Sequence, residues 1–285
     1  MIYHPNAKIN LGLNVTSSRT DGYHNLETVF YPIPLCDTLS VSTQEESDEE
    51  CNTTESAPDF VLHTGGIPMN CPASHNLIIK VLRSLKADHH FGRIHISLLK
   101  RIPSGAGLGG GSSDAAFMLK ALNQLLNMKI SGNEMEQRLT KIGADCAFFI
   151  RNKPMFATGI GNELTPVNLS LKGWNIVIIK PQAFVSTPKA YSLIHPQKPQ
   201  HCAADIINEP VENWKETLHN DFEQGVFSLF PQIGRIKAQL YDLGATYAAM
   251  SGSGSAVFGL FRQTQSPNTL HTIFKENFIW QCRLT

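Results

Sequence analysis

The stretch from Pro103 to Ala116 reads PSGAGLGGGSSDAA, and it places five glycines in the seven positions 105–111. Apolar residues at helical spacing follow directly, at Ala115, Leu119, Leu122 and Leu126. Glycine adopts positive φ and lets the backbone come close to a ligand, so consecutive amides can point at one anion. The helix, which we expect to begin near Ser112, adds unpaired amides and the positive end of its dipole. The stretch therefore predicts a phosphate-binding loop that opens a helix.

Three polar residues specify the start of this helix. Ser112, Ser113 and Asp114 are all favourable N-cap residues. Either serine hydroxyl could also face a phosphate oxygen or a Mg²⁺ ion bound to phosphate. The alternative is an ordinary loop that caps a helix, which so dense a glycine cluster disfavours.

Two common glycine loops fit less well. A Walker A loop ends in Gly-Lys-Ser/Thr, but the chain has no lysine between Arg101 and Lys120. Residues 105–110 do match the dinucleotide pattern G-x-G-x-x-G. A dinucleotide site also needs an acidic residue about twenty positions on, where the chain offers only Glu134 and Glu136 on a polar helix surface.

Length and composition favour a two-domain protein without a nucleic-acid surface. The chain has 285 residues, of which 42% are hydrophobic, enough for substantial cores. Its 24 basic and 24 acidic residues cancel, and the basic ones are dispersed, which argues against nucleic-acid binding. We expect domains at 1–160 and 161–285, because a new series of elements begins after residues 158–162.

The cysteines and histidines give no sign of a disulfide framework or a metal site. Six separated cysteines include no C-x-x-C pair, so we expect reduced thiols in a cytoplasmic protein. The N-terminus lacks the pattern of a signal peptide, and no apolar run reaches about 18 residues. His89, His90 and His95 form the densest histidine cluster, but no cysteine or acidic partner completes a ligand set.

Hydrophobic periodicity predicts mixed helix and strand. Residues 7–15 alternate, with Lys8 and Asn10 on the polar face of an expected half-buried strand. The polar, acidic residues 44–56 are interpreted as a mobile surface insertion. Further strands are expected at 28–33, 94–98, 174–179, 245–250, 256–261 and 278–284, with a flexible glycine-rich tip at 251–255. Helices are expected at 76–85 after a Ser74 cap, at 135–142 before a terminating Gly143, at 233–243 and at 270–274.

Several motifs together resemble the GHMP kinases, named after galactokinase, homoserine kinase, mevalonate kinase and phosphomevalonate kinase. The glycine loop is similar to their motif Pro-x-x-x-Gly-Leu-Gly-x-Ser-Ser. The other matching segments are Ala7-Lys8-Ile9-Asn10, Gly143-Ala144-Asp145, Asn220-Asp221-Phe222-Glu223 and Met250 to Ser255. The resemblance implies an α+β, two-domain fold, with a ribosomal protein S5 domain 2-like N-terminal domain and a ferredoxin-like C-terminal domain, and an active site in the cleft between them.

The resemblance also implies roles in phosphoryl transfer from ATP with Mg²⁺. Lys8 corresponds to the lysine near the acceptor and the transferred phosphate, and Asp145 to the carboxylate that takes the hydroxyl proton. The chain departs from the family after Asp145, where Cys146-Ala147 replaces the common Val-Pro. Cys146 is not expected to be a nucleophile, because no histidine follows nearby to activate it. The residues expected to bind ATP are Pro103, Ser104, Gly105, Ala106, Gly107, Leu108, Gly109, Gly110, Gly111, Ser112 and Ser113.

Substrate choice rests on a second set of residues. Asp21-Gly22-Tyr23-His24 resembles the segment that reads cytosine in the GHMP kinases of the non-mevalonate isoprenoid pathway, which phosphorylate a cytidine diphosphate-linked alcohol. In that segment the tyrosine and histidine, here Tyr23 and His24, engage the cytosine ring, and stacking on Tyr23 plus hydrogen bonds to the Watson–Crick edge is a sensible way to select that base. Phe184 and Thr187 resemble a segment that closes over the cytidine, and Asn10 joins them as an expected substrate contact. A homoserine or mevalonate type of kinase remains the alternative, and a monomer or weak homodimer without membrane or nucleic-acid partners is expected.

Overall fold

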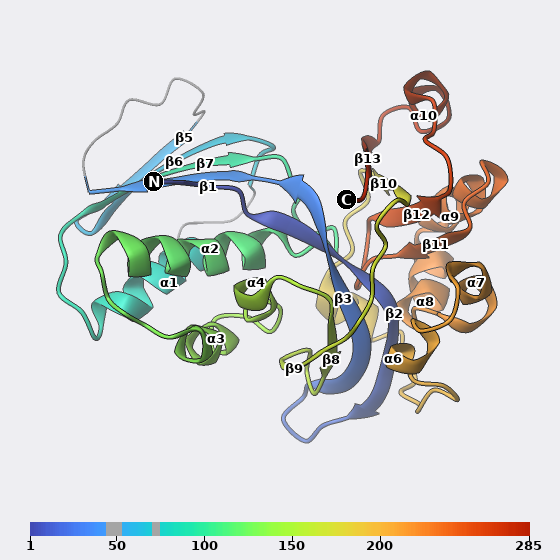
Figure 1. Cartoon of the computed structure of the whole chain (residues 1–285), viewed down its shortest axis with the longest axis horizontal. Helices are drawn as coiled ribbons and strands as arrows, with labels where there is room; N and C mark the ends of the chain where they lie inside the picture. Colours follow the sequence, from blue (N-terminus) through green and yellow to red (C-terminus); the bar gives the residue numbers. More distant parts are fainter. Residues whose placement is uncertain (44–52, 70–74) are drawn as a thin grey trace. The chain divides into compact units, whose positions relative to one another are not determined.

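The computed structural model describes residues 1–43, 53–69 and 75–285, which divide into two compact units (Figure 1). The first unit contains Met1–Ala7, Leu35–Ser104 and Gly109–Asn152. The second contains Lys8–Pro34, Gly105–Leu108 and Lys153–Thr285. Each unit therefore draws on separated parts of the chain, and the glycine stretch contributes residues to both. The domain boundary expected between residues 160 and 161 stays a prediction.

The first unit is a sheet covered by helices. Its strand order is β1 (Ile2–Tyr3), β4 (Thr38–Ser42), β7 (Ile94–Lys100), β6 (Phe60–Gly66) and β5 (Thr53–Ala57). Strands β6 and β7 are parallel, and the chain between them forms α1 (Leu77–Lys86), the crossover that a parallel pair needs. Helices α1 and α2 (Gly110–Leu125) pack together on one face of this sheet (Figure 1). Helices α3 (Gly132–Thr140) and α4 (Phe148–Arg151) complete the unit.

The second unit contains an antiparallel sheet with its own core. The sheet order is β11 (Tyr247–Met250), β12 (Val257–Phe261), β10 (Asn175–Lys180) and β13 (Phe278–Arg283). Buried side chains of this sheet pack with those of α8 (Phe222–Leu229), α9 (Pro231–Asp242) and α10 (Pro267–Ile273). Three short helices, α5 (Thr187–Tyr191), α6 (Ala203–Ile206) and α7 (Trp214–Thr217), and the 3-10 turn η2 (Val211–Asn213) lie along the connections. The hairpin expected around residues 251–255 is confirmed as β11 and β12.

A third sheet carries the N-terminal motif. Its order is β2 (Asn6–Ser18), β3 (His24–Cys36), β8 (Met155–Thr158) and β9 (Glu163–Pro166). The alternation in residues 7–15 correctly predicts a strand, but the expectation of a half-buried one is wrong. Lys8 and Asn10 on its polar face are each only 3% exposed, because both faces of this part of β2 are covered.

The observed elements correct four expectations, three at helix ends and one at a strand. Asn76 caps α1 by accepting from the Ile78 amide at 3.0 Å, whereas Ser74 lies outside the described residues. Helix α2 begins at Gly110 rather than near Ser112, because Gly109 with φ of +72° is its N-cap. Helix α3 ends at Thr140, so Gly143 does not terminate it. The acidic segment was wrongly interpreted over residues 53–56, which belong to strand β5, while 44–52 lie outside the described part of the chain.

Candidate active site

Contacts with neighbouring residues hold Lys8 inside the second unit. Its Nζ donates to Asn10 Oδ1 at 2.6 Å and to the Gly107 carbonyl at 3.0 Å. The ammonium also lies 5.0 Å from the centre of the Phe30 ring, within the range of a cation–π contact. Asn10 Nδ2 in turn donates to Thr28 Oγ1 at 3.0 Å. The lysine is therefore a fixed, buried cation beside the glycine loop, and in this structure Asn10 serves to position it.

The glycine loop turns its carbonyls into the protein. The Ala106 carbonyl accepts from the Ala256 amide at 3.1 Å, and the Leu108 carbonyl accepts from the Lys8 amide at 2.9 Å. Between them, the Gly107 carbonyl accepts from both Lys8 Nζ and Ser251 Oγ. The amides of residues 105–108 donate no hydrogen bond to another described residue. Carbonyls that are bonded and amides that are not make a backbone cradle suited to an anion.

Gly107 is the position where a side chain is least tolerable. Its φ is +75°, and a Cβ there would lie 1.8 Å from the Ser251 carbonyl oxygen. Ser251 is fully buried, and its hydroxyl donates to the Gly107 carbonyl at 2.8 Å and accepts from the Asn10 amide at 3.2 Å. The hairpin tip at 251–255, expected to be flexible, is thus largely buried against the loop.

Asn220 holds this hairpin tip through hydrogen bonds of its side chain. Its Nδ2 donates to the carbonyls of Met250 and Gly252 at 2.8 and 2.9 Å, while its Oδ1 accepts from the Phe222 amide at 3.0 Å. The side chain is only 4% exposed. The segment Asn220–Glu223, which the sequence related to the family only by similarity, thereby acquires a physical function as a support for the tip.

The first turn of α2 supplies the serines in the first unit. Ser112 is partly exposed, whereas Ser113 is fully buried and its Oγ has no hydrogen-bond partner among the described residues. Gly111 is exposed, and a Cβ there would meet open space. Ser112 is consequently the better placed of the two hydroxyls to face a ligand.

Asp145 lies in the turn between α3 and α4, also in the first unit. Its neighbour Cys146 is hydrogen-bonded to the Ser112 side chain, which joins this turn to the start of α2. Burial raises the pKa of the Cys146 thiol to about 12, so the thiol stays protonated at neutral pH. This supports the expectation that Cys146 is no nucleophile.

The residues expected to recognise a base lie in the second unit. Tyr23 and Phe184 are 60% and 67% exposed, an unusual state for large aromatic side chains and one that leaves both rings free to stack. The Phe184 ring also covers the glycine loop, because a Cβ on Gly105 would lie 2.7 Å from it. Thr187 Oγ1 lies 3.2 Å from Ser253 Oγ, so its segment touches the hairpin tip.

A buried ion cluster was missed by sequence analysis. Lys100 Nζ donates to Asp37 Oδ2 and, at 2.7 Å, to Asp114 Oδ2, and all three side chains are at most 3% exposed. Asp37 Oδ1 also accepts from the amides of Arg101 and Ile102, just before the glycine stretch. Asp114 was expected to be an N-cap residue but lies in the second turn of α2, where its carboxylate joins this cluster. No pattern in the sequence pairs residues 37, 100 and 114, since they meet only through the fold.

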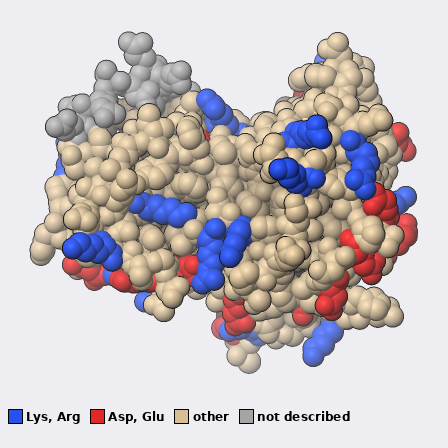
Figure 2. All heavy atoms as spheres, viewed as in Figure 1, with Lys and Arg blue, Asp and Glu red and all other residues tan. Residues whose placement is uncertain are grey.

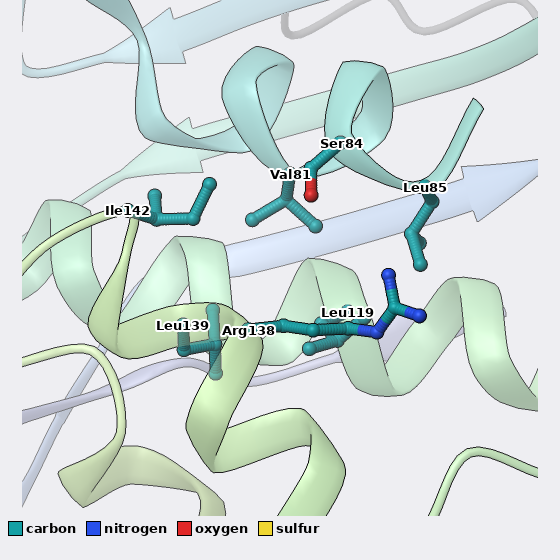
Figure 3. A pocket seen from close by; sticks show the side chains of 7 residues that line it. All are labelled: Val81, Ser84, Leu85, Leu119, Arg138, Leu139 and Ile142. Atoms are coloured by element: carbon teal, nitrogen blue, oxygen red, sulfur yellow. The ribbon is translucent and has the colours of Figure 1, made fainter. Parts of the chain in front are cut away.

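A small cavity and the distribution of charge are further features of the described residues. A cavity of about 10 Å³ between α1, α2 and α3 has about the volume needed for a single water molecule. Figure 3 shows its lining of Val81, Ser84, Leu85, Leu119, Arg138, Leu139 and Ile142. On the face drawn in Figure 2, Lys and Arg form small separate groups rather than a stripe. Within the described ranges, no group of three or more His, Cys, Asp or Glu could hold a metal ion, and no helix is long and apolar enough to cross a membrane.

Family comparison places this arrangement among known proteins. Residues 76–153 match the profile of the GHMP kinases N terminal domain, and residues 203–279 match that of the GHMP kinases C terminal domain. The first match covers the glycine stretch and Asp145, and the second covers the Asn220 segment and the hairpin tip. The chain belongs to the GHMP kinase family, and its mixed, two-domain fold is that of the family, as the sequence predicted.

Comparison with individual members of the family shows which of them this chain is most similar to in sequence and in fold among those described below. The chain is 50% identical over 284 residues to the 4-diphosphocytidyl-2-C-methyl-D-erythritol kinase of Bacteroides fragilis, with all of both chains covered. A crystal structure of 4-(cytidine 5'-diphospho)-2C-methyl-D-erythritol kinase superposes with a TM-score of 0.77 at 32% identity, covering 99% of this chain and 98% of that one. Mevalonate kinase of Methanococcus jannaschii superposes with a TM-score of 0.70 but only 15% identity, covering 100% and 98%, so that likeness concerns the fold alone.

Proposed function

We propose that this protein transfers a phosphoryl group from ATP to the 2-hydroxyl of 4-diphosphocytidyl-2-C-methyl-D-erythritol, a step in non-mevalonate isoprenoid biosynthesis. The observation that carries the kinase chemistry is the backbone cradle at residues 105–108, with its bonded carbonyls and available amides next to the buried Lys8 ammonium. Full-length identity of 50% to a kinase named for this substrate supports the choice of acceptor.

Phosphoryl transfer depends chiefly on positioning and on offsetting charge. The amides of the cradle hold the phosphates of ATP, and the partly exposed Ser112 hydroxyl adds a further contact. Lys8, fixed by Asn10 and Gly107, steadies the negative charge that develops on the transferred group. Asp145 accepts the proton that leaves the acceptor hydroxyl, because an ionised carboxylate is a competent base at neutral pH.

Magnesium would bind at this site chiefly through the phosphates of ATP. Without a set of three His, Cys, Asp or Glu ligands among the described residues, the ion would be held mainly by the phosphates, which is common for Mg²⁺. Ser112 is the side chain on α2 placed to assist it. When bound, the ion would neutralise part of the phosphate charge.

The cytidine diphosphate moiety is recognised by the exposed rings. Tyr23 and Phe184 stack on the cytosine, His24 hydrogen-bonds to its edge, and Thr187 lies in the same segment as Phe184. We further propose a cytoplasmic enzyme that acts as a monomer or weak homodimer without membrane or nucleic-acid partners. We assign its domains to residues 1–160 and 161–285.

A coupled assay of ADP release tests the function. Purified protein and MgATP are offered 4-diphosphocytidyl-2-C-methyl-D-erythritol or the methylerythritol phosphate that lacks the cytidyl group. We expect turnover only with the cytidyl substrate. Activity on homoserine or mevalonate, offered in parallel, together with silence on the cytidyl substrate, would replace the proposed acceptor while keeping the kinase assignment.

A further inference from the structure

Beneath the expected base-reading residue His24 lies a stack of aromatic rings. The His24 imidazole stacks on the Tyr191 ring with their centres 4.8 Å apart and their planes 21° from parallel. Tyr191 in turn meets the Phe222 ring edge-on, at 4.9 Å and 90°. Both geometries are favourable for aromatic pairs. His24 thus rests on a column of two further rings.

The column has a rigid base. Phe222 is 2% exposed and belongs to the core that α8 and α9 build on the β11-β12-β10-β13 sheet. Its amide is bonded to Asn220 Oδ1, and Asn220 also fixes the Met250 and Gly252 carbonyls of the hairpin tip. Tyr191 is the last residue of α5 and packs on the same core. Tyr191 therefore links the orientation of the His24 ring to the hydrophobic core.

Tyr191 also shares its segment with the other base-contacting residues. Phe184 and Thr187 precede it, and the Ala183 carbonyl accepts from Ser255 Oγ at 2.7 Å. The segment 183–191 is thereby fastened to the hairpin tip at one end and to His24 at the other. An imidazole that reads the edge of a base must hold its ring plane, because hydrogen bonds weaken steeply with misalignment.

We propose that Tyr191 is a positioning residue for cytidine recognition, which holds the His24 imidazole in its reading orientation by stacking beneath it. The inference rests on the proposed function for its biological meaning, but its physical content is the binding of a cytidine nucleotide. Tyr191 itself needs no contact with the substrate. Its ring, rather than its hydroxyl, performs this role.

Calorimetric titration with cytidine diphosphate tests the inference separately from turnover. Tyr191→Leu should weaken binding about three- to tenfold, the worth of one aromatic pair, while Tyr191→Phe, which keeps the ring, should bind within about twofold of wild type. Phe227→Leu is the matched control, because Phe227 packs on the same core and lies against Gly234 of α9, so this change should leave the affinity unchanged. In a His24→Ala background, Tyr191→Leu should have no further effect, since the two residues act as one unit.

The possible results separate the two proposals. If Tyr191→Leu binds cytidine diphosphate like wild type, or weakens it equally without His24, or if the wild type does not bind it, the positioning role is refuted. ADP release by wild type on the cytidyl substrate decides the proposed function independently. Binding that depends on Tyr191 in a protein that does not turn over that substrate would uphold this inference and overturn the proposed function.

Discussion

Replacing Lys100 by methionine should destabilise the protein strongly. The change removes the ammonium but keeps a flexible apolar side chain of similar length, so packing is nearly preserved. Two carboxylates that are almost completely buried then lose their shared cation. Removing one partner from a buried ion pair costs about 3–5 kcal/mol, because the remaining charge is left unsolvated.

The two carboxylates should contribute unequally to the loss of stability. Asp37 keeps its bonds from the Arg101 and Ile102 amides. Asp114 has no such pair of backbone donors among the described residues, and its Oδ1 lacks any hydrogen-bond partner there. Most of the loss should therefore arise at Asp114, and removing that carboxylate as well should recover part of it.

Urea unfolding of three proteins measures this asymmetry. Lys100→Met should lower the free energy of unfolding by about 3–5 kcal/mol, and the double variant Lys100→Met/Asp114→Leu should lose clearly less. The loss in the single variant should also be smaller at pH 5 than at pH 9, because Asp114, with a pKa of about 7 in the folded protein, is ionised only at the higher pH. A loss below about 1 kcal/mol, within the range of exposed ion pairs, or a double variant less stable than the single one, would refute the reasoning.

Four further predictions concern the site and its surroundings. Asp145→Asn should keep ATP affinity and lose about 10²- to 10⁴-fold in kcat, so steady-state kinetics with an unchanged kcat would remove this residue from the mechanism. Gly107→Ala should weaken ATP binding and lower the melting temperature, since its Cβ would collide with the Ser251 carbonyl, and a thermal-shift titration with ATP checks both effects. Burial raises the pKa of Asp114 to about 7, above its unfolded value of about 3.9. Asp114 thus binds its proton more tightly in the folded protein than in the unfolded chain. The stability that this proton contributes is present below about pH 4 and is lost as pH rises toward 7, by up to about 1.4 kcal/mol per pH unit. The difference in unfolding free energy between wild type and Asp114→Asn should follow this slope. Cys146 in the folded protein should resist iodoacetamide up to pH 9, because its thiol has a pKa of about 12, and rapid labelling seen by mass spectrometry would contradict its burial.

Local signals in the sequence located most of the elements that carry the site. The alternation around Lys8 predicted β2, and the paired apolar runs around the serine and glycine tip predicted the β11–β12 hairpin, because both patterns depend on nearest-neighbour geometry. The start of α2 was misplaced by two residues, because the preference of serine for the N-cap was weighed more heavily than the left-handed conformation that Gly109 adopts.

Contacts between residues far apart in the chain could not be predicted from the sequence, for a physical reason. Lys100, Asp37 and Asp114 look individually like solvated charges. Only the packing of β7, α2 and the junction between β3 and β4 brings them together and excludes water. The same holds for the stack of His24 on Tyr191, which are far apart in the chain and carry no local pattern. Propensity and periodicity describe neighbours in sequence, whereas burial of a charge or a ring is a property of the whole fold.

The glycine loop shows how the two kinds of information combine. Its glycines indicate a backbone that can approach a ligand, but they do not indicate which backbone groups face that ligand. In the structure, hydrogen bonds engage the carbonyls of residues 106–108. The donors are the Ala256 amide, the Ser251 hydroxyl, and the amide and ammonium of Lys8. A peptide unit has the carbonyl of one residue and the amide of the next on opposite sides, so fixing the carbonyls of residues 106 and 107 inward turns the amides of residues 107 and 108 outward. Lys8 therefore has two effects in one position: its amide and ammonium help to fix the cradle, and its charge makes the same place favourable for phosphate.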